Sequence, residues 1–183
     1  MVEQRSKALE QTRRLLEAQH QQASDDDKVW RALAIEARDV PLVIPINNVV
    51  ELAVCENITP IPLTQTWIRG LTNLRGQLYT VIDLSVFFGG HETRLSRDAR
   101  IVLLSDDGFN TCLLVNSVLG LKVFGEDQPL GDVANVSTDI KPFFRGQIDE
   151  GERQWAVLDV DALITDKRFL TPGRLEAVPG LEH

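Results

Sequence analysis

Two aspartates are the residues of this chain with the clearest potential for acid–base chemistry. Asp83 and Asp159 each follow a short apolar run. A pair of carboxylates in different environments can act as general acid and general base, which would suit a small all-β hydrolase. Each aspartate also precedes a short helical pattern, where its side chain can cap the helix by accepting backbone N–H bonds. We favour the capping role and keep the hydrolase as a distant alternative.

Metal and nucleophile chemistry has little support in the sequence. The three histidines, His20, His91 and His183, have no cysteine or acidic partner at ligand spacing. Cys55 and Cys112 lie in apolar surroundings without CxxC spacing, which is typical of buried thiols in a reducing compartment. Nucleotide-binding and nucleophile-elbow motifs are absent. The sequence therefore predicts no metal, no cofactor and no enzyme, and favours a binding module.

Composition narrows the class of partner. The chain has 183 residues, of which 43% are hydrophobic and 25% charged, and its net charge is -8. This acidic balance argues against nucleic acid and anionic membranes, because attraction to phosphate needs clustered lysine and arginine. Apolar runs fall short of the roughly 18 residues of a membrane helix, and the polar N-terminus indicates no signal peptide. We expect a cytoplasmic protein without direct membrane insertion.

The elements that must position these residues are short strands separated by turn signals, which predicts an all-β fold. The central stretch is residues 67–88, in which Asn73–Gly76 forms a hairpin corner between two apolar runs. The run at 78–84 is apolar enough for a buried strand. Further strands are expected at 29–36, 42–46, 49–55, 101–104, 111–115, 118–124, 143–148 and 155–160.

Helical patterns flank the predicted strands. Residues 3–22 are rich in helix formers and carry a narrow apolar stripe at Leu9 and Leu16, with Thr12 and Leu15 beside it. We predict an N-terminal helix and an acidic linker over residues 1–27; the helix either packs on the body or on a partner, or stays solvated. A short helix is expected at 162–169. Residues 172–183 form a tail whose end, Leu181-Glu182-His183, resembles the start of a histidine tag.

An internal repeat divides the body of the chain into two related halves. Residues 67–88 align without gaps on residues 143–164, an offset of 76, and residues 46–52 align on 115–121, an offset of 69. Gly70 meets Gly146, and Asp83 meets Asp159, so we assign structural roles to these four residues. The repeat predicts two related lobes, about 28–90 and about 100–165, whose ends can interchange.

The repeat also isolates two charges of the first lobe. Glu51 aligns with Gly120 and Arg75 aligns with Gly151, so neither charge has an aligned counterpart in the second lobe. We infer that Glu51 and Arg75 form an ion pair that holds the hairpin corner against the strand at 49–55; the alternative is two independent surface charges. A half-exposed pair contributes only about 0–1 kcal/mol, so its value would lie in shape and recognition.

These motifs resemble the signature of the CheW-like adaptor family. The resemblance runs from about residue 29 to residue 169, and it includes residues 45–51 and 58–62. Its most specific part is Asn73-Leu74-Arg75-Gly76 followed by Val81-Ile82-Asp83-Leu84. The resemblance implies two SH3-like five-stranded β-barrels within a domain of residues 28–171. It also implies a non-enzymatic adaptor that joins a methyl-accepting chemoreceptor to a CheA-type histidine kinase in a chemosensory array.

The resemblance implies two binding surfaces as well. One lobe docks the regulatory domain of the kinase, which is built on the same fold, and a hydrophobic groove between the lobes holds the cytoplasmic tip of the receptor. Such arrays would lie on the inner membrane surface. By motif, the candidate partner-binding residues are Val49, Glu51, Asn73, Arg75 and Gly76. Around the groove, where the match is looser, the candidates are Val43, Val118 and Phe124.

The output pathway is suggested by the two ends of the chain. The N-terminal helix and the ending at residues 166–170 are more similar to PilI-type adaptors, which serve type IV pilus systems that control twitching motility, than to an ordinary CheW. We therefore favour a twitching-motility adaptor, with a flagellar chemotaxis CheW as the alternative. A barrel-type ligand sensor is a further rival, and it would need an enclosed cavity.

Overall fold

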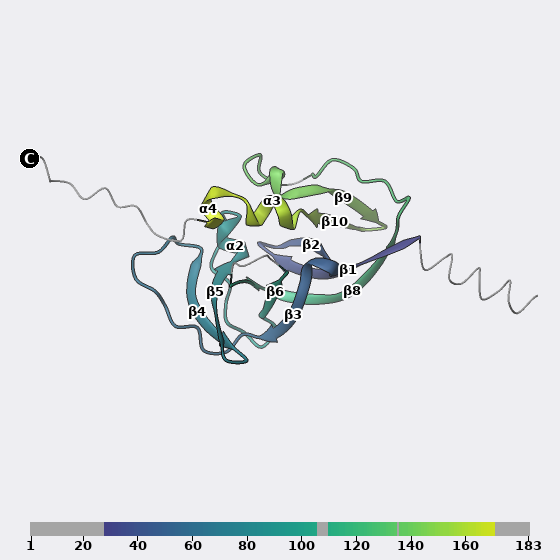
Figure 1. Ribbon diagram of the computed structural model, residues 1–183. Helices are drawn as coiled ribbons and strands as arrows, with labels where there is room; N and C mark the ends of the chain where they lie inside the picture. The colour runs from purple at the N-terminus through teal and green to yellow at the C-terminus, as the bar shows by residue number, and fades with distance from the viewer. Residues whose placement is uncertain (1–27, 106–109, 135, 171–183) are drawn as a thin grey trace, which may run out of the picture.

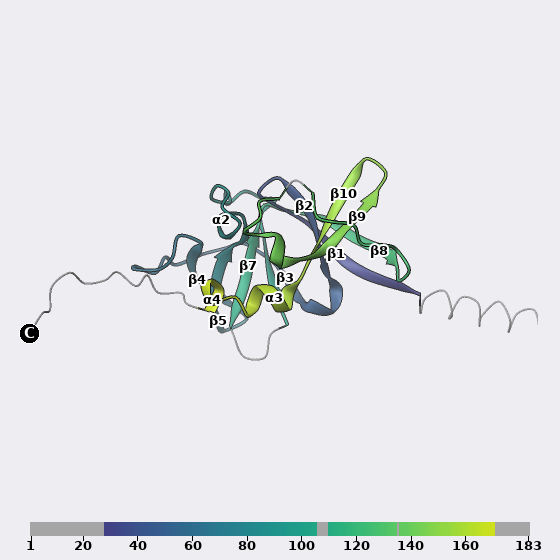
Figure 2. The same cartoon turned by 90° about the horizontal axis from the view of Figure 1, so that it is seen from above.

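A computed structural model describes residues 28–105, 110–134 and 136–170, and the regular structure in these ranges is mostly β. Figures 1 and 2 show two sheets joined by loops and short helices. The all-β prediction is therefore confirmed, whereas the predicted N-terminal helix, its linker and the tail at 172–183 lie outside the described residues. The strands are β1 (Val29–Ala37), β2 (Val40–Pro45), β3 (Val49–Val54), β4 (Ile68–Leu74), β5 (Gln77–Asp83), β6 (Arg100–Leu104), β7 (Thr111–Val115), β8 (Ser117–Gly125), β9 (Phe144–Glu150) and β10 (Arg153–Leu158).

The two five-stranded sheets each combine strands from both halves of the chain. The β1 sheet has the order β8-β1-β2-β10-β9, and the β3 sheet has the order β3-β6-β7-β5-β4. The two orders coincide when each of β1 to β5 is matched with the strand five places later. The sequence repeat is thus a unit of five strands, and the two copies exchange their first two strands. Consequently the boundary near residues 90–100 separates the repeats but not the sheets.

The two copies share local detail as well as strand order. The register of β4 on β5 shifts between Ile68 and Gly70, which leaves Arg69 as the extra residue of a bulge. The register of β9 on β10 shifts in the same way around Arg145. Each sheet also contains one parallel pair, β5 with β7 and β10 with β2.

Glycine is required at both bulges. Gly70 has a φ of 136° and Gly146 a φ of 153°, a region that residues with a Cβ rarely adopt. A Cβ on Gly70 would lie 2.0 Å from the carbonyl oxygen of Thr59, because Thr59 forms a β-bridge with Leu71. A Cβ on Gly146 would lie 2.7 Å from the Cβ of Leu130. The two glycines therefore permit equivalent close approaches of a loop to a hairpin.

Three apolar clusters hold the sheets together, and the largest, the inter-sheet core, lies between them. Leu42 of β2 and Val102 of β6 belong to this inter-sheet core. The opposite faces of the sheets form smaller cores of their own, with Trp155 in the β1 sheet and Cys112 in the β3 sheet. The central strands are buried on both faces, which explains why their sequences are continuous apolar runs rather than alternating ones.

Short helices follow the equivalent strands β5 and β10. Asp83 accepts hydrogen bonds from two backbone N–H groups at the start of α2 (Leu84–Phe87), and Asp159 accepts one, from the N–H of Ala162, at the start of α3 (Val160–Ile164). The capping role predicted for both aspartates is confirmed. The single helix predicted at 162–169 is instead two short helices, because α3 ends before Thr165 and α4 (Lys167–Leu170) starts anew. Among the described residues, the remaining helical segments are the 3₁₀ turns η1 (Ile46–Asn48) and η2 (Lys141–Phe143).

Whether each sheet closes into a barrel depends on the pairing of its two edge strands. Among the described strands, pairing in each sheet runs from one edge strand to the other, and the edge strands do not pair with each other. Two five-stranded sheets are therefore established, while their closure into barrels stays a prediction.

The bulge geometry predicts a large difference between two glycine substitutions. Gly70→Ala should lower the free energy of unfolding by about 3 kcal/mol or more, because its Cβ collides with backbone and its φ is strained. Gly76→Ala, where φ is 88° and the space is open, should cost only about 1–2 kcal/mol. Urea denaturation followed by circular dichroism measures both values. Equal losses would contradict the assignment of Gly70 to a close backbone approach.

Candidate partner-binding surfaces

The hairpin corner between β4 and β5 is shaped by its own residues. Arg75 and Gly76 have φ values of 52° and 88°, and they form a two-residue connection between the paired residues Leu74 and Gln77. Two consecutive positive φ values are the pattern of a type I′ turn, whose twist suits a hairpin. The side-chain oxygen of Asn73 accepts a 2.8 Å hydrogen bond from the Gly76 N–H. Asn73 and Gly76 therefore fix the corner, and Arg75 projects from it.

The predicted ion pair between Glu51 and Arg75 is confirmed. The Arg75 guanidinium lies 3.0 Å from a Glu51 carboxylate oxygen, and the arginine side chain is 81% exposed. Glu51 is on β3, at one edge of the β3 sheet, whereas Arg75 follows β4, at the other edge. The ion pair thus bridges the two edges of one sheet. Val49, at the start of β3, is half-buried and packs against the inter-sheet core.

The β1 sheet contains an equivalent pair that the sequence alignment missed. Lys122 on the edge strand β8 lies 2.6 Å from Glu150, at the end of the opposite edge strand β9. The charges are reversed: β3 carries the acid, Glu51, whereas its counterpart β8 carries the base, Lys122. The alignment missed the pair because Lys122 and Glu150 stand two and one positions away from the residues aligned with Glu51 and Arg75.

Trp155 contacts both members of the Lys122–Glu150 pair. Its indole N–H donates a 3.0 Å hydrogen bond to Glu150, and the Lys122 ammonium lies 5.1 Å from the centre of its ring. The hydrogen bonds from Lys122 and then from Trp155 lower the pKa of the Glu150 carboxyl. A carboxyl with a lowered pKa keeps its charge to a lower pH than an ordinary glutamate does. The bridge across the β1 sheet is therefore retained in mildly acidic solution.

Both edge strands also expose a row of apolar side chains. We call these the β3 row (Val50, Leu52 and Val54) and the β8 row (Leu119, Leu121 and Val123). Val50 is 62% exposed and Leu121 57% exposed, and the other members are exposed as well.

The two rows lie on the faces that form the inter-sheet core. Leu52 pairs with Val102, and Leu121 pairs with Leu33. Directly opposed residues of antiparallel strands point to the same face, and Val102 and Leu33 belong to the inter-sheet core. The β3 and β8 rows therefore extend that core outwards to uncovered edges. Sequence reasoning missed them, because alternation does not reveal which strand lacks a neighbour.

The three residues predicted to line the groove, Val43, Phe124 and Val118, differ in their burial. Val43 is fully buried and Phe124 is 3% exposed, both within the small core of the β1 sheet. Phe124 also packs against Trp30, with ring centroids 4.9 Å apart. Side chains without exposed surface cannot line a groove, so assigning Val43 and Phe124 to it was wrong. Val118 is half-buried against the inter-sheet core, and its role in a groove stays a prediction.

Asp83 is a buried structural carboxylate rather than a free base. Besides capping α2, it accepts hydrogen bonds of 2.8 Å from both the backbone N–H and the hydroxyl of Thr93. Its four donors, which include the N–H groups of Ser85 and Val86, match the roughly four acceptor sites of a carboxylate. Thr93 lies in the connection between the two repeats, so Asp83 fastens that connection to α2. Nothing in the spacing of the sequence points to this bond.

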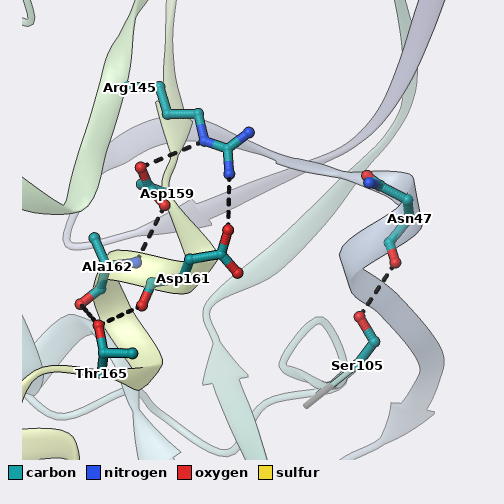
Figure 3. A network of polar contacts seen from close by, with 7 residues as sticks. All are labelled: Asn47, Ser105, Arg145, Asp159, Asp161, Ala162 and Thr165. Atoms are coloured by element: carbon teal, nitrogen blue, oxygen red, sulfur yellow. Dashed lines mark hydrogen bonds and ion pairs between the residues drawn. The ribbon is translucent and has the colours of Figure 1, made fainter. Parts of the chain in front are cut away.

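The carboxylate of Asp159 binds other partners, an arginine and one backbone N–H group (Figure 3). The Arg145 guanidinium lies 3.4 Å from Asp159 and 3.3 Å from Asp161. Asp159 also accepts the 3.1 Å capping bond from the N–H of Ala162. Asp83 and Asp159 therefore stand at equivalent positions of different sheets, each bound to its own neighbours. The hydrolase alternative, which needs the two carboxylates at one site, loses its geometric basis.

Other site types find no support in the part of the chain that the structure describes. Within residues 28–105, 110–134 and 136–170, His, Cys, Asp and Glu side chains do not form a group of three that could hold a metal ion. In the same ranges no helix is long and apolar enough to cross a membrane.

The fold and these surfaces define a class of protein. Two sheets that expose apolar edge rows and charged edge pairs, with no assembled catalytic group among the described residues, are typical of a protein-interaction module. The CheW-like domain family matches residues 31–168, and the chain belongs to this family.

Individual relatives agree with this assignment. The chain is 26% identical over 141 residues to protein PilI of Pseudomonas aeruginosa, covering 77% of this chain and 79% of PilI. It is 27% identical over 143 residues to the chemotaxis protein CheW of Thermotoga maritima, covering 78% and 93%. The scaffolding protein TtCheW of Thermoanaerobacter tengcongensis has a similar fold, with a TM-score of 0.65, 24% identity, and coverage of 76% of this chain and 94% of TtCheW.

The core of the β3 sheet predicts an unreactive thiol. Cys112 is fully buried on β7, and burial, followed by the nearby Cys55, raises the pKa of its thiol to about 12. Only the thiolate reacts with disulfide reagents. At pH 8, Cys112 of the folded protein should therefore escape labelling by dithionitrobenzoate, whereas both cysteines should react in urea. Mass spectrometry of the labelled peptides measures this.

The same raised pKa sets the sign of a pH effect. Above the ordinary thiol pKa of 9.0, the unfolded chain forms Cys112 thiolate while the folded chain keeps the thiol, so stability should decline as the pH rises past 9. A Cys112→Ala variant should lose this part of the decline. Fast labelling of Cys112 in the folded protein at pH 8 would contradict its burial.

Proposed function

We propose that this chain is a non-enzymatic chemosensory adaptor that couples a methyl-accepting chemoreceptor to a CheA-type histidine kinase. The observation that carries the proposal is the presence of two edge surfaces with the same architecture and opposite charge polarity. A protein that joins two partners needs two separate docking surfaces held in a fixed relation. Membership in the CheW-like family supports the same role.

The surface around Glu51 and Arg75 is our candidate for docking the regulatory domain of the kinase. Arg75 projects from a corner whose backbone is fixed by Asn73 and Gly76. A rigid, exposed arginine suits recognition, because arginine is enriched among the residues that carry most of the binding energy once a partner covers them. A kinase domain with the same fold would present a comparable edge to this corner.

The exposed apolar rows are our candidates for contacting the receptor. The β3 and β8 rows lie on the inter-sheet faces of their sheets, so they are suited to an elongated apolar partner. A helical hairpin places an apolar side chain on one face about every turn, and such a stripe commonly binds an apolar groove. Val118 stands at the start of β8, next to the β8 row, and would extend this surface.

Coupling between the two surfaces follows from the way in which the sheets are built. Because each sheet contains strands of both repeats and shares the inter-sheet core, the two surfaces belong to one packed unit. Two partners bound to such a unit are held in a defined relative orientation. The state of the receptor can then bias the state of the kinase through differential contacts in the complex.

SH3-like barrels are part of the proposal. In each sheet an ion pair spans the two edges, Glu51 with Arg75 and Lys122 with Glu150. Edges brought within ion-pair distance favour a strongly curled sheet, and the small core enclosed by each sheet is what such a barrel would contain.

The docking role of Arg75 can be measured directly. Arg75→Ala should weaken binding to the regulatory domain of the cognate kinase about tenfold, because an arginine that the partner covers is a frequent hot spot. Arg97→Ala, which removes an exposed arginine from the connection between the repeats, is the matched control and should bind normally. Glu51→Ala combined with Arg75→Ala should cost less than the sum of the single variants. Unchanged affinity of a folded Arg75→Ala protein would remove Arg75 from the interface.

We further propose that the adaptor acts in the cytoplasm, in receptor arrays on the inner membrane surface, and serves type IV pilus twitching motility. The similarity to PilI supports this output, and flagellar chemotaxis is the alternative, since the identity to CheW is almost the same. Deleting the chromosomal copy in the source organism should abolish twitching on agar while swimming in soft agar is retained. Loss of swimming with normal twitching would assign the protein to the flagellar pathway.

A further inference from the structure

The described chain passes between the two sheets at two points. The first crossing is η1, between β2 and β3, and the second is Asn116, the single residue between β7 and β8. Elsewhere in the described residues, consecutive strands belong to the same sheet. A change in the angle between the sheets would therefore be absorbed at these two crossings, because hinges are the few element-terminal residues that join two packed bodies.

The crossing at Asn116 is held by groups from both sheets. The backbone N–H of Asn116 donates a 2.9 Å hydrogen bond to the carbonyl of Glu36 on β1. Its side-chain oxygen lies 3.4 Å from the hydroxyl of Thr93, and that hydroxyl donates a 2.8 Å bond to Asp83, the last residue of β5. Thr93 is 1% exposed and Asp83 is fully buried. We call Asp83, Thr93 and Asn116 the polar joint, because they link the β3 sheet to the residue that leads into β8.

The connection that carries Thr93 is itself fastened to both sheets. The guanidinium of Arg38, in the turn between β1 and β2, donates a hydrogen bond to the carbonyl of Phe88, which follows α2. Arg69, the bulge residue of β4, lies 2.7 Å from Glu92. A Cβ on Gly90 would lie 2.7 Å from the Cγ of Arg38. The connection therefore runs close against the β1 sheet while its polar groups bind the β3 sheet.

The other crossing is built differently. Asn47 aligns with Asn116 in the sequence repeat, but Asn47 is exposed. Its backbone carbonyl accepts a 3.2 Å hydrogen bond from the hydroxyl of Ser105, at the end of β6 (Figure 3). The two crossings are thus equivalent in the repeat, whereas a buried threonine side chain holds the one at Asn116.

The polar joint supplies what the inter-sheet core lacks. Apolar burial is non-directional, so it holds two sheets together without selecting one angle between them. Hydrogen bonds weaken steeply when they are bent, so they do select an angle. The joint also borders an open polar cleft of about 630 Å³, lined in part by Arg38, Gly90 and Asn116. Groups that parted there would meet solvent rather than apolar core, so other angles remain accessible when the joint is broken.

We propose that Thr93 is a positioning residue that fixes the angle between the β1 sheet and the β3 sheet. The consequence for signalling rests on the proposed function. The receptor would contact the β3 row on one sheet and the β8 row on the other, so its affinity depends on that angle. The kinase surface at Glu51 and Arg75 belongs to the β3 sheet alone and does not depend on it.

Electron spin resonance distance measurements test the joint in the isolated full chain. Spin labels are attached to Leu78→Cys on β5 and Glu152→Cys in the turn between β9 and β10, both exposed positions, with Cys55→Ser as background. Thr93→Val keeps the side-chain shape but removes the hydroxyl, and it should broaden the distribution of distances between the labels. Thr93→Ser keeps the hydroxyl and should give the wild-type distribution. A role of Thr93 in packing alone predicts the reverse order.

The matched control is Thr72→Val. Thr72 is 2% exposed, and its hydroxyl donates a 3.2 Å hydrogen bond to the carbonyl of Glu56 without joining the two sheets. This variant should leave the distance distribution unchanged. Asn116→Ala keeps the bond between Asp83 and Thr93, and it should broaden the distribution even if Thr93→Val does not fold. Equal broadening in Thr72→Val, or an unchanged distribution in Asn116→Ala, would overturn the proposal.

The link to signalling is measured with the two partners separately. Thr93→Val should bind a helical-hairpin peptide from the cytoplasmic tip of the cognate receptor about fivefold more weakly, because only molecules at the binding angle are competent. Its affinity for the kinase regulatory domain should equal that of the wild type. Equal weakening for both partners, or unchanged receptor affinity, would reject the link. If the wild type binds neither partner, the proposed adaptor function fails, while the distance measurements still decide the role of Thr93.

Discussion

The inter-sheet core is the constraint on which the rest of this structure depends. Each sheet buries one face against the other sheet and the opposite face in a core of its own. Burying a large aliphatic side chain contributes about 1.5–3 kcal/mol relative to leaving it exposed, so strands buried on both faces are strongly held. Because the repeats exchange β1–β2 and β6–β7, neither sheet can be completed without residues from both halves of the chain.

This exchange gives the two candidate partner surfaces their fixed relation. The edge strands β3 and β8 occupy equivalent positions of the two sheets, and each continues the inter-sheet face into an exposed apolar row. The edge pairs reverse their charges, with Glu51 on β3 and Lys122 on β8. Repetition therefore supplies two surfaces of similar shape, and the reversed polarity allows them to differ in the partners they accept.

Buried polar groups serve architecture in this protein. Asp83 uses its carboxylate to fasten Thr93, and hence the connection between the repeats, to the end of the β3 sheet. Arg145 joins Asp159 and Asp161 beside the equivalent helix. The aspartates that suggested acid–base chemistry are thus held by hydrogen bonds and ion pairs that complete the fold. At Asp83, which is fully buried, the hydrogen bonds offset the desolvation of the carboxylate, whereas Asp159 and Asp161 stay partly exposed.

The sequence by itself determined the repeat, the hairpin corner, the capping aspartates and the pair Glu51–Arg75, because each depends on local spacing or on comparison of the two halves. Only the tertiary structure decided which strands share a sheet, and with them the Lys122–Glu150 bridge, the exposed β3 and β8 rows and the burial of Val43 and Phe124. The physical reason is that the residue pattern of an apolar strand reflects the alternation of its own side chains, but not which strands lie beside it. An edge strand and a central strand can have the same pattern, and packing alone decides which face remains open to a partner.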